Sequence, residues 1–241
     1  MNGFTFRDLV DDSAALLRRY GPIAYLEFLA LGIAGTTLQV LLAPTAFRAR
    51  VSEPGGDLVA LMFDPLVLMS EAAFALLFGI ACLRIWWEQT GAAPPPAERR
   101  ALLAAQAAPL VVLNIATGYL GYIGLLAMLL PGLLIAALTT TLSPVILIER
   151  RGWDSLRRSV QMAVPHVFTL TAGWAAILLP WLVLSVAIAP PPAPPEASLT
   201  GLWLAWLLPD AAGAALTAVS LCLTMAAYGR ITGTEGSRPS R

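Results

Sequence analysis

Glu71 is the only charged residue in the apolar stretch between Pro65 and Leu83. A charged side chain at the middle of a bilayer costs about 2.5 to 3.5 kcal/mol on insertion scales, so acids in such stretches are usually paired or functional. We expect Glu71 to carry a proton, to bond Asn114 or Gln39 from neighbouring segments, or to face a cavity that water or lipid headgroups can enter. Two interpretations stay open: a hydrogen-bonded structural acid, or a ligand or proton site that includes Glu71 and Asn114.

Two other acids in apolar surroundings stand next to prolines: Asp64 precedes Pro65, and Asp210 follows Pro209. An aspartate beside a proline is typical of a helix start, where a carboxylate also stabilises the positive end of the helix dipole. The sequence therefore predicts that both acids begin helices near an interface. A position inside the membrane is the alternative.

Two features of the apolar segments are expected to have structural roles. Glu27 and Arg84 are expected at similar depth near one interface, where an ion pair is the simplest arrangement. The segment TTTLSP, residues 139–144, is expected to bend its helix, because Pro144 removes a backbone hydrogen bond. Its hydroxyls are expected to bond carbonyls of their own helix, with a polar-lined cavity as the alternative.

A charged loop, ERRGWDSLRRS at residues 149–159, separates two of the most apolar stretches of the chain. Its spacing predicts a short interfacial helix from Trp153 to Met162 that begins after a turn at Gly152. We expect Arg158 to reach back to Glu149. Anionic lipid headgroups are the competing partners of the loop's arginines, which are Arg150, Arg151, Arg157 and Arg158. Alternatively, these arginines only fix the orientation in the membrane.

The composition is that of a multi-pass membrane protein. Of the 241 residues, 58% are hydrophobic and 12% are charged, and several apolar runs reach the length of about 20 residues that a spanning helix needs. The sequence predicts an all-α fold with six transmembrane helices. We place the spans at residues 22–43, 65–86, 107–130, 132–149, 164–189 and 209–229.

The distribution of arginines predicts how these spans are oriented. All 15 basic residues are arginines, and all but Arg48 and Arg50 lie in segments on the side of the two termini. Because basic residues are enriched on the cytoplasmic side of membranes, both termini and the 149–159 loop are predicted to be cytoplasmic.

The N-terminal segment is predicted to form an amphipathic helix on the membrane surface. Apolar residues recur on one face, Thr5 and Asp8 form a capping-box pattern, and Gly21 followed by Pro22 is expected to end the helix. A continuous extension of the first spanning helix is the alternative. The predicted division of the chain is an interfacial helix at 1–21, a transmembrane domain at 22–229 and a disordered cytoplasmic tail at 230–241.

The sequence lacks the signatures of soluble enzymes, including phosphate-binding loops, zinc-protease motifs and serine-hydrolase motifs. Cys82 and Cys222 lie in separate apolar segments without a nearby His or Cys, so we predict neither a disulfide framework nor a metal site. No cofactor is expected. The net charge of zero and the location of the arginines make nucleic acid an unexpected partner.

The segment PGLLIAALTTTLSPVILIERRGWDSLRRS, residues 131–159, resembles the membrane domain of some bacterial glycerophosphoryl diester phosphodiesterases and its stand-alone six-helix relatives. The matching pattern is Pro-Gly, a span that ends in proline and glutamate, a glycine, and a short helix that ends in Arg-Ser. Its residues here are Pro131, Gly132, Pro144, Glu149, Gly152, Arg158 and Ser159. The resemblance implies a six-helix fold in the bacterial inner membrane and no particular reaction.

Three classes of function stay open. The first is a non-enzymatic membrane protein that binds lipid or a protein partner, or assembles with its own copies, in membrane organisation. The alternative is a transporter or exporter of a lipid-like or small amphiphilic solute, which would use Glu71 and the bent fourth span. An intramembrane enzyme comes third, because no nucleophile and base can be paired from the sequence.

Overall fold

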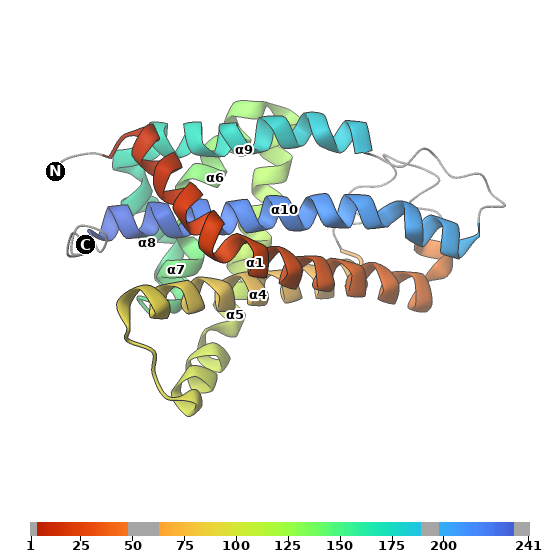
Figure 1. Cartoon of the computed structure of the whole chain (residues 1–241), viewed down its shortest axis with the longest axis horizontal. Coiled ribbons are helices and arrows are strands. Elements are labelled where there is room, and N and C mark those ends of the chain that lie inside the picture. Colours follow the sequence, from red (N-terminus) through yellow and green to blue (C-terminus); the bar gives the residue numbers. More distant parts are fainter. Residues whose placement is uncertain (1–3, 48–62, 189–197, 234–241) are drawn as a thin grey trace.

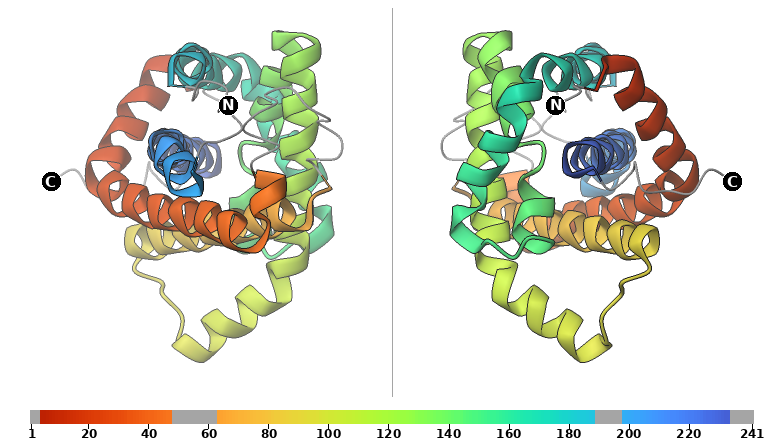
Figure 2. Two further views of the ribbon diagram at one scale, coloured as in Figure 1. Left: turned by 90° about the vertical axis from the view of Figure 1, so that its right-hand side faces the viewer. Right: turned by 90° about the vertical axis from the view of Figure 1, so that its left-hand side faces the viewer.

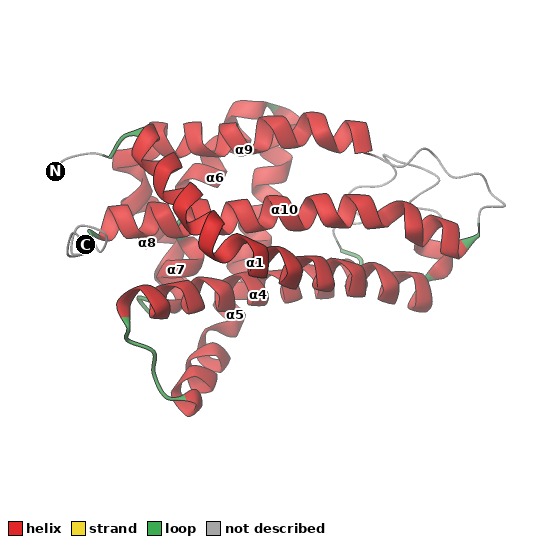
Figure 3. Ribbon diagram, viewed as in Figure 1, coloured by secondary structure: helices red, strands yellow, loops and turns green. Residues whose placement is uncertain are grey.

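The computed structural model describes residues 4–47, 63–188 and 198–233, and every regular element in these ranges is a helix (Figure 3). Within these ranges, six segments are long and apolar enough to cross a membrane, in agreement with the predicted number of spans. The principal helices are α1 (Phe6–Leu42), α4 (Pro65–Thr90), α5 (Pro96–Ala127), α6 (Leu129–Thr139), α7 (Leu142–Leu147), α8 (Ser155–Ala163), α9 (Val167–Ile188) and α10 (Leu199–Thr232).

Helix α10 lies in the middle of the bundle, with the other long helices arranged around it (Figure 2). It packs along α1 more extensively than any other two elements pack together. Small residues such as Ala218 and Ala226 are buried there, and small side chains allow close approach between membrane helices. The main core cluster joins this face to Leu9 and Phe28 of α1. The first and last described helices therefore form the centre of the core.

Helix α1 begins as predicted but does not end where predicted. The Thr5 hydroxyl accepts a hydrogen bond from the Asp8 backbone N–H at 3.2 Å, and the Asp8 carboxylate accepts one from the Thr5 backbone N–H at 2.8 Å. The predicted end at Gly21 and Pro22 is wrong, because the helix runs on to Leu42 along a curved path (Figure 1). A proline removes only one helical hydrogen bond, which a packed membrane helix tolerates.

The apolar face of the first turns of α1 belongs to the protein core. Leu9, Leu16 and Tyr20 are buried, and they join the same cluster as Ala24 and Phe28 beyond the proline. This uninterrupted face explains why the helix continues, and it matches the alternative of an extended first helix. An interfacial position of residues 1–21 stays a prediction.

The two aspartates predicted to begin helices behave differently. The Asp64 carboxylate accepts hydrogen bonds from the backbone N–H groups of Leu66 and Val67, at 2.8 and 3.3 Å, so its prediction as the cap of α4 is confirmed. The prediction for Asp210 is wrong. Helix α10 begins earlier, after the cap Ser198, and Pro209 lies inside it. Residues 234–241 of the predicted disordered tail lie outside the described residues, and the tail's first three residues belong to α10.

The start of α1 and the end of α10 lie at the same end of the bundle (Figure 1). An ion pair joins Asp12 of α1 to Arg230 of α10. The Phe4 ring lies on the ring of His166, just before α9, with 4.7 Å between the ring centroids. These contacts place both ends of the described chain on one side, as an even number of spans requires.

Helices α5 and α6 form a tight hairpin that depends on two glycines. A Cβ atom added to Gly124 would lie 2.9 Å from the Cα of Gly132, and one added to Gly132 would lie 2.5 Å from the backbone nitrogen of Leu125. Real Cβ atoms essentially never approach so closely. The absence of both side chains therefore sets the separation of these helices.

Candidate functional site

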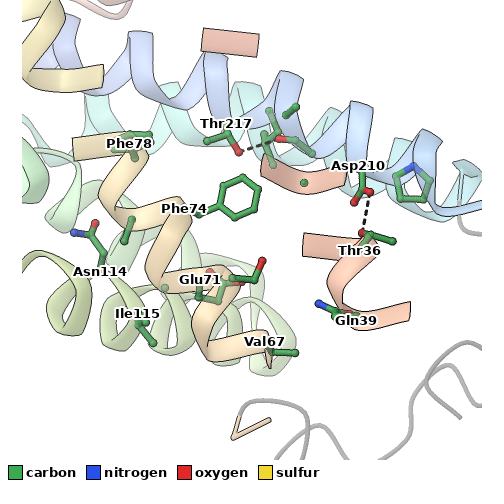
Figure 4. Close-up of a pocket in the computed structure, with 18 of the residues that line it drawn as sticks. Thr36, Gln39, Val67, Glu71, Phe74, Phe78, Asn114, Ile115, Asp210 and Thr217 are labelled. Carbon is green, nitrogen blue, oxygen red and sulfur yellow. Dashed lines mark hydrogen bonds between the residues drawn. The ribbon is translucent and has the colours of Figure 1, made fainter. Parts of the chain in front are cut away.

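A cavity of about 770 Å³ lies among α1, α4, α5 and α10 (Figure 4). Its volume is in the range of small-molecule sites, about 300 to 1,000 Å³. Two carboxylates line it, those of Glu71 and Asp210, and no arginine is among the described residues of its wall. The aromatic residues of the wall are Phe47, Phe74, Phe78, Tyr119, Tyr122 and Trp206.

Glu71 lies two turns inside α4, at the depth expected from a helix that begins at Pro65. Its side chain is exposed and lines the cavity. Within the described ranges it makes no hydrogen bond or ion pair, whereas Asp210 in the same wall bonds Thr36. This geometry corresponds to the predicted alternative of an acid that faces a cavity.

Asn114 lines the same cavity but bonds other groups. Its amide nitrogen donates to the Leu110 carbonyl at 2.7 Å, and its carbonyl oxygen accepts from the Ser143 hydroxyl at 3.0 Å. Asn114 therefore links α5 to α7. The structure brings Asn114 and Glu71 to one wall without a hydrogen bond between them.

Asp210 is a member of the site, although its sequence context predicted a helix start. Its carboxylate accepts a hydrogen bond from the Thr36 hydroxyl at 2.9 Å (Figure 4). Gly32 of α1 lies beside it, and a Cβ added there would be in ordinary van der Waals contact with the Asp210 Cβ, at 3.5 Å. The apolar run before Pro209 is the sequence signal for this position. Because α10 already includes residues 199–208, Asp210 lies inside the helix and not at its start.

A second cavity of about 720 Å³ adjoins the first, among α5, α6, α9 and α10. Three of its threonine hydroxyls, those of Thr117, Thr139 and Thr140, donate to carbonyls of their own helices. The described wall of this second cavity has no ionisable acid or arginine. The residues shared by both cavities are Phe78, Asn114, Gly118, Tyr122 and Leu216. The pair thus combines a chamber that has two carboxylates with one whose described wall has no charged side chain.

The predicted bend in the fourth span is present as a break between α6 and α7, at Thr140 and Thr141. The Thr140 hydroxyl accepts from the Trp174 indole N–H at 2.8 Å, and the Thr141 hydroxyl lies 3.0 Å from the Ser159 hydroxyl. Ser159 also donates to the Leu138 carbonyl at 3.1 Å. The break is therefore fixed by contacts to α8 and α9.

The predicted pair between Glu149 and Arg158 is present, with 3.2 Å between the guanidinium and the carboxylate. Arg151 is a second partner of the same carboxylate, at 3.0 Å. Gly152 has φ +57°, in the left-handed region that glycine favours, and the chain turns there into the short helix α8. The remaining residues of the resemblance occupy different environments, with Pro131 exposed and Pro144 buried.

Arg150 and Arg157 are exposed and make no ion pair with any part of the chain that the structure describes. Their guanidinium groups are therefore available to another partner. By contrast, the predicted pair of Glu27 and Arg84 is present, and one of its two hydrogen bonds is 2.9 Å long.

No group of metal-ligating side chains occurs among the described residues. Both cysteines are free and buried in separate helices. Comparisons with protein-family models, curated proteins and solved structures find no match to the chain. The two cavities are therefore the features of the molecule from which a function can be inferred.

Proposed function

We propose that this chain is a non-enzymatic multi-pass membrane protein that binds a lipid-like or small amphiphilic solute inside its helical bundle. The observation that carries the proposal is the cavity of about 770 Å³ with the Glu71 carboxylate in its wall, which has no hydrogen-bond or ion-pair partner among the described residues. A structural acid would be expected to bond a neighbour, because an unsatisfied polar group in an apolar environment is costly. A carboxylate at a cavity wall can instead interact with a bound solute.

The two chambers suit a molecule with one polar and one apolar part. The first cavity has the carboxylates of Glu71 and Asp210 in its wall, whereas the described wall of the second has hydroxyl groups and no carboxylate. Binding sites of this kind are mostly apolar, with a few polar groups that fix orientation. A solute that reaches both chambers would place its headgroup near Glu71.

Filling the cavity should remove the bound solute. Gly118 lines both cavities, and a Cβ added there would meet no atom within 4 Å, so the side chain of Gly118→Phe begins in open space beside both cavities. We expect native mass spectrometry of the protein in native lipid discs to show a retained amphiphile in the unmodified chain and little of it in Gly118→Phe. Ala116→Phe is the matched control, because Ala116 is exposed on the same helix and lines neither cavity.

Equal retention of amphiphiles by both phenylalanine variants would contradict the proposal. The same holds if the unmodified protein retains no more lipid than Gly118→Phe, whose filled cavity leaves only the lipid bound at the protein surface. Melting temperatures of both variants should stay close to that of the parent, which separates loss of binding from loss of folding.

We further propose that the end of the bundle with the chain termini faces the cytoplasm of a bacterial inner membrane. The arginine distribution supports this orientation, and the resemblance of residues 131–159 supports the location. Arg150 and Arg157 would then face the cytoplasmic leaflet, where anionic headgroups are suitable partners for exposed guanidinium groups. Assembly with a protein partner or with further copies of the chain is compatible with the same orientation.

The orientation can be tested by labelling single cysteines with an impermeant thiol reagent in spheroplasts. Asp154 and Thr200 are exposed at opposite ends of the bundle, whereas Ser155 is buried and would be protected on either side. We expect Thr200→Cys to react and Asp154→Cys to react only after lysis. The native Cys82 and Cys222 are buried and give little background. The reverse labelling pattern would refute the orientation.

Transport of the same solute is a second candidate. The observation that favours it is that the two cavities adjoin, and together they extend from α1 and α4 to α6 and α9. Such a passage could carry an amphiphile sideways through the bundle. The break in the fourth span, between α6 and α7, lies at the wall of the second chamber.

A further inference from the structure

We infer that the solute of the first cavity is a cationic amphiphile, with a positively charged headgroup beside Glu71 and Asp210 and an apolar body in the second chamber. This inference rests on the proposed function and adds the charge of the ligand. The charge of the wall, its aromatic residues and the shape of the two chambers each support it.

The charge of the wall favours a cation. The cavity has two carboxylates from different helices and no arginine among its described residues. Asp210 bonds only the neutral Thr36 hydroxyl, and Glu71 bonds no group within the described ranges. Elsewhere in the bundle, Glu27, Asp12 and Glu149 each have an arginine partner. The two carboxylates at the cavity, in contrast, have no arginine partner among the described residues.

The aromatic wall supports the same choice. Phenylalanine, tyrosine and tryptophan rings attract a cation over their faces, and this attraction is strongest in a desolvated site. Phe74, Tyr119, Tyr122 and Trp206 line the chamber that contains the two carboxylates. The buried Trp206 indole N–H has no acceptor among the described residues, so it can also donate to an oxygen of the solute.

The second chamber accommodates the apolar part. Leu125, Leu178 and Leu182 line it, and the hydroxyls of Thr117, Thr139 and Thr140 in its wall are bonded to carbonyls of their own helices. Gly118 stands at the junction and leaves open space between the chambers. A molecule with a charged head and an apolar body would therefore bury each part beside matching side chains.

A pair of ions with nearly the same shape and opposite charge provides the test. We expect tetraphenylphosphonium to bind saturably to the full chain in discs of zwitterionic lipid, and tetraphenylborate not to bind. Empty discs give the background, because both ions enter lipid. Radiolabelled ion and equilibrium dialysis give the affinity directly.

Variants assign the binding to the cavity and to its charge. Glu71→Gln and Asp210→Asn should each weaken binding of tetraphenylphosphonium by about tenfold, as expected from the loss of one charged contact. Glu98→Gln makes the same change of charge at an exposed residue outside the cavity and should leave the affinity unchanged. Gly118→Phe should abolish binding, whereas Ala116→Phe should not.

The outcomes separate this inference from the proposed function. If both ions bind saturably and Gly118→Phe abolishes this binding, the inference that the ligand is positively charged is wrong. The proposal that the cavity binds an amphiphile would still stand. Binding of neither ion, or binding that Gly118→Phe does not change, would overturn the cationic site, while the native lipid discs test amphiphile binding independently. If Asp210→Asn fails to fold, Glu71→Gln still decides, because Glu71 has no described partner to lose.

Discussion

Gly132→Ala should destabilise the bundle strongly although it adds a single methyl group. The added Cβ would lie 2.5 Å from the backbone nitrogen of Leu125 and 2.8 Å from the carbonyl oxygen of Gly121. Backbone atoms cannot move aside as a flexible side chain can, so α5 and α6 would have to separate. We expect a cost of about 3 kcal/mol, at the upper end of overpacking effects. Thermal unfolding in detergent and the fraction of monodisperse protein measure it.

Gly118→Ala is the matched control on the same hairpin. A Cβ at Gly118 meets no atom within 4 Å, and alanine favours the helix over glycine by about 1 kcal/mol. Its melting temperature should therefore equal or exceed that of the unmodified chain. If Gly132→Ala and Gly118→Ala melt together, the close approach of α5 and α6 does not determine stability.

Arg84→Leu should also destabilise the bundle strongly, because it leaves the Glu27 carboxylate without its cation. Breaking a fully buried pair on one side costs about 3 to 5 kcal/mol. The two side chains are 31% and 32% exposed, so we expect a smaller cost of about 2 to 3 kcal/mol. The measurement is again the unfolding free energy or melting temperature in a mild detergent.

Removing both charges should restore most of this loss. The double variant Glu27→Leu with Arg84→Leu leaves no unpaired charge, and apolar replacement of an ion pair is often neutral or stabilising. Arg7→Leu is the control, because Arg7 and Asp11 form a pair with side chains 91% and 71% exposed, which contributes little. A double variant no more stable than Arg84→Leu would show that the pair acts through packing and not through charge.

The number of spans could be predicted from the sequence because an apolar run of about 20 residues matches the thickness of the bilayer core. Helix caps and ion pairs between residues close in the sequence could also be predicted. Asp64 beside Pro65 and Glu149 near Arg158 illustrate this, and both predictions are confirmed. Short sequence distance or a well-defined capping pattern limits the possible partners in such cases.

Prolines caused the main errors in the predicted fold. The sequence predicts a helix end at Pro22 and a helix start at Pro209, yet both lie inside helices that continue for many residues. In a membrane bundle, packing on both sides of the proline outweighs the loss of one backbone hydrogen bond. Local sequence rules do not contain this contribution from the neighbouring helices.

The candidate site was predicted only in part for a related reason. Glu71 can be recognised because it is the only charged residue in an apolar run. Asp210 lines the cavity because α10 begins at Leu199 and not at Pro209, and this earlier start is not evident from the residues around Asp210. The bond between Asp210 and Thr36 joins residues 174 positions apart. The hydrophobic periodicity of a sequence does not indicate which residues so far apart will form a hydrogen bond.

The central position of α10 has a consequence for biogenesis. Helix α10 follows all the other described spans in the chain, yet it covers the apolar face of α1. During synthesis α1 enters the bilayer long before its main neighbour leaves the ribosome. Incomplete bundles expose surfaces on which proteases and chaperones act. Nascent chains that stop before Leu199 should consequently depend on an insertase or chaperone, and they should be degraded faster than the complete bundle.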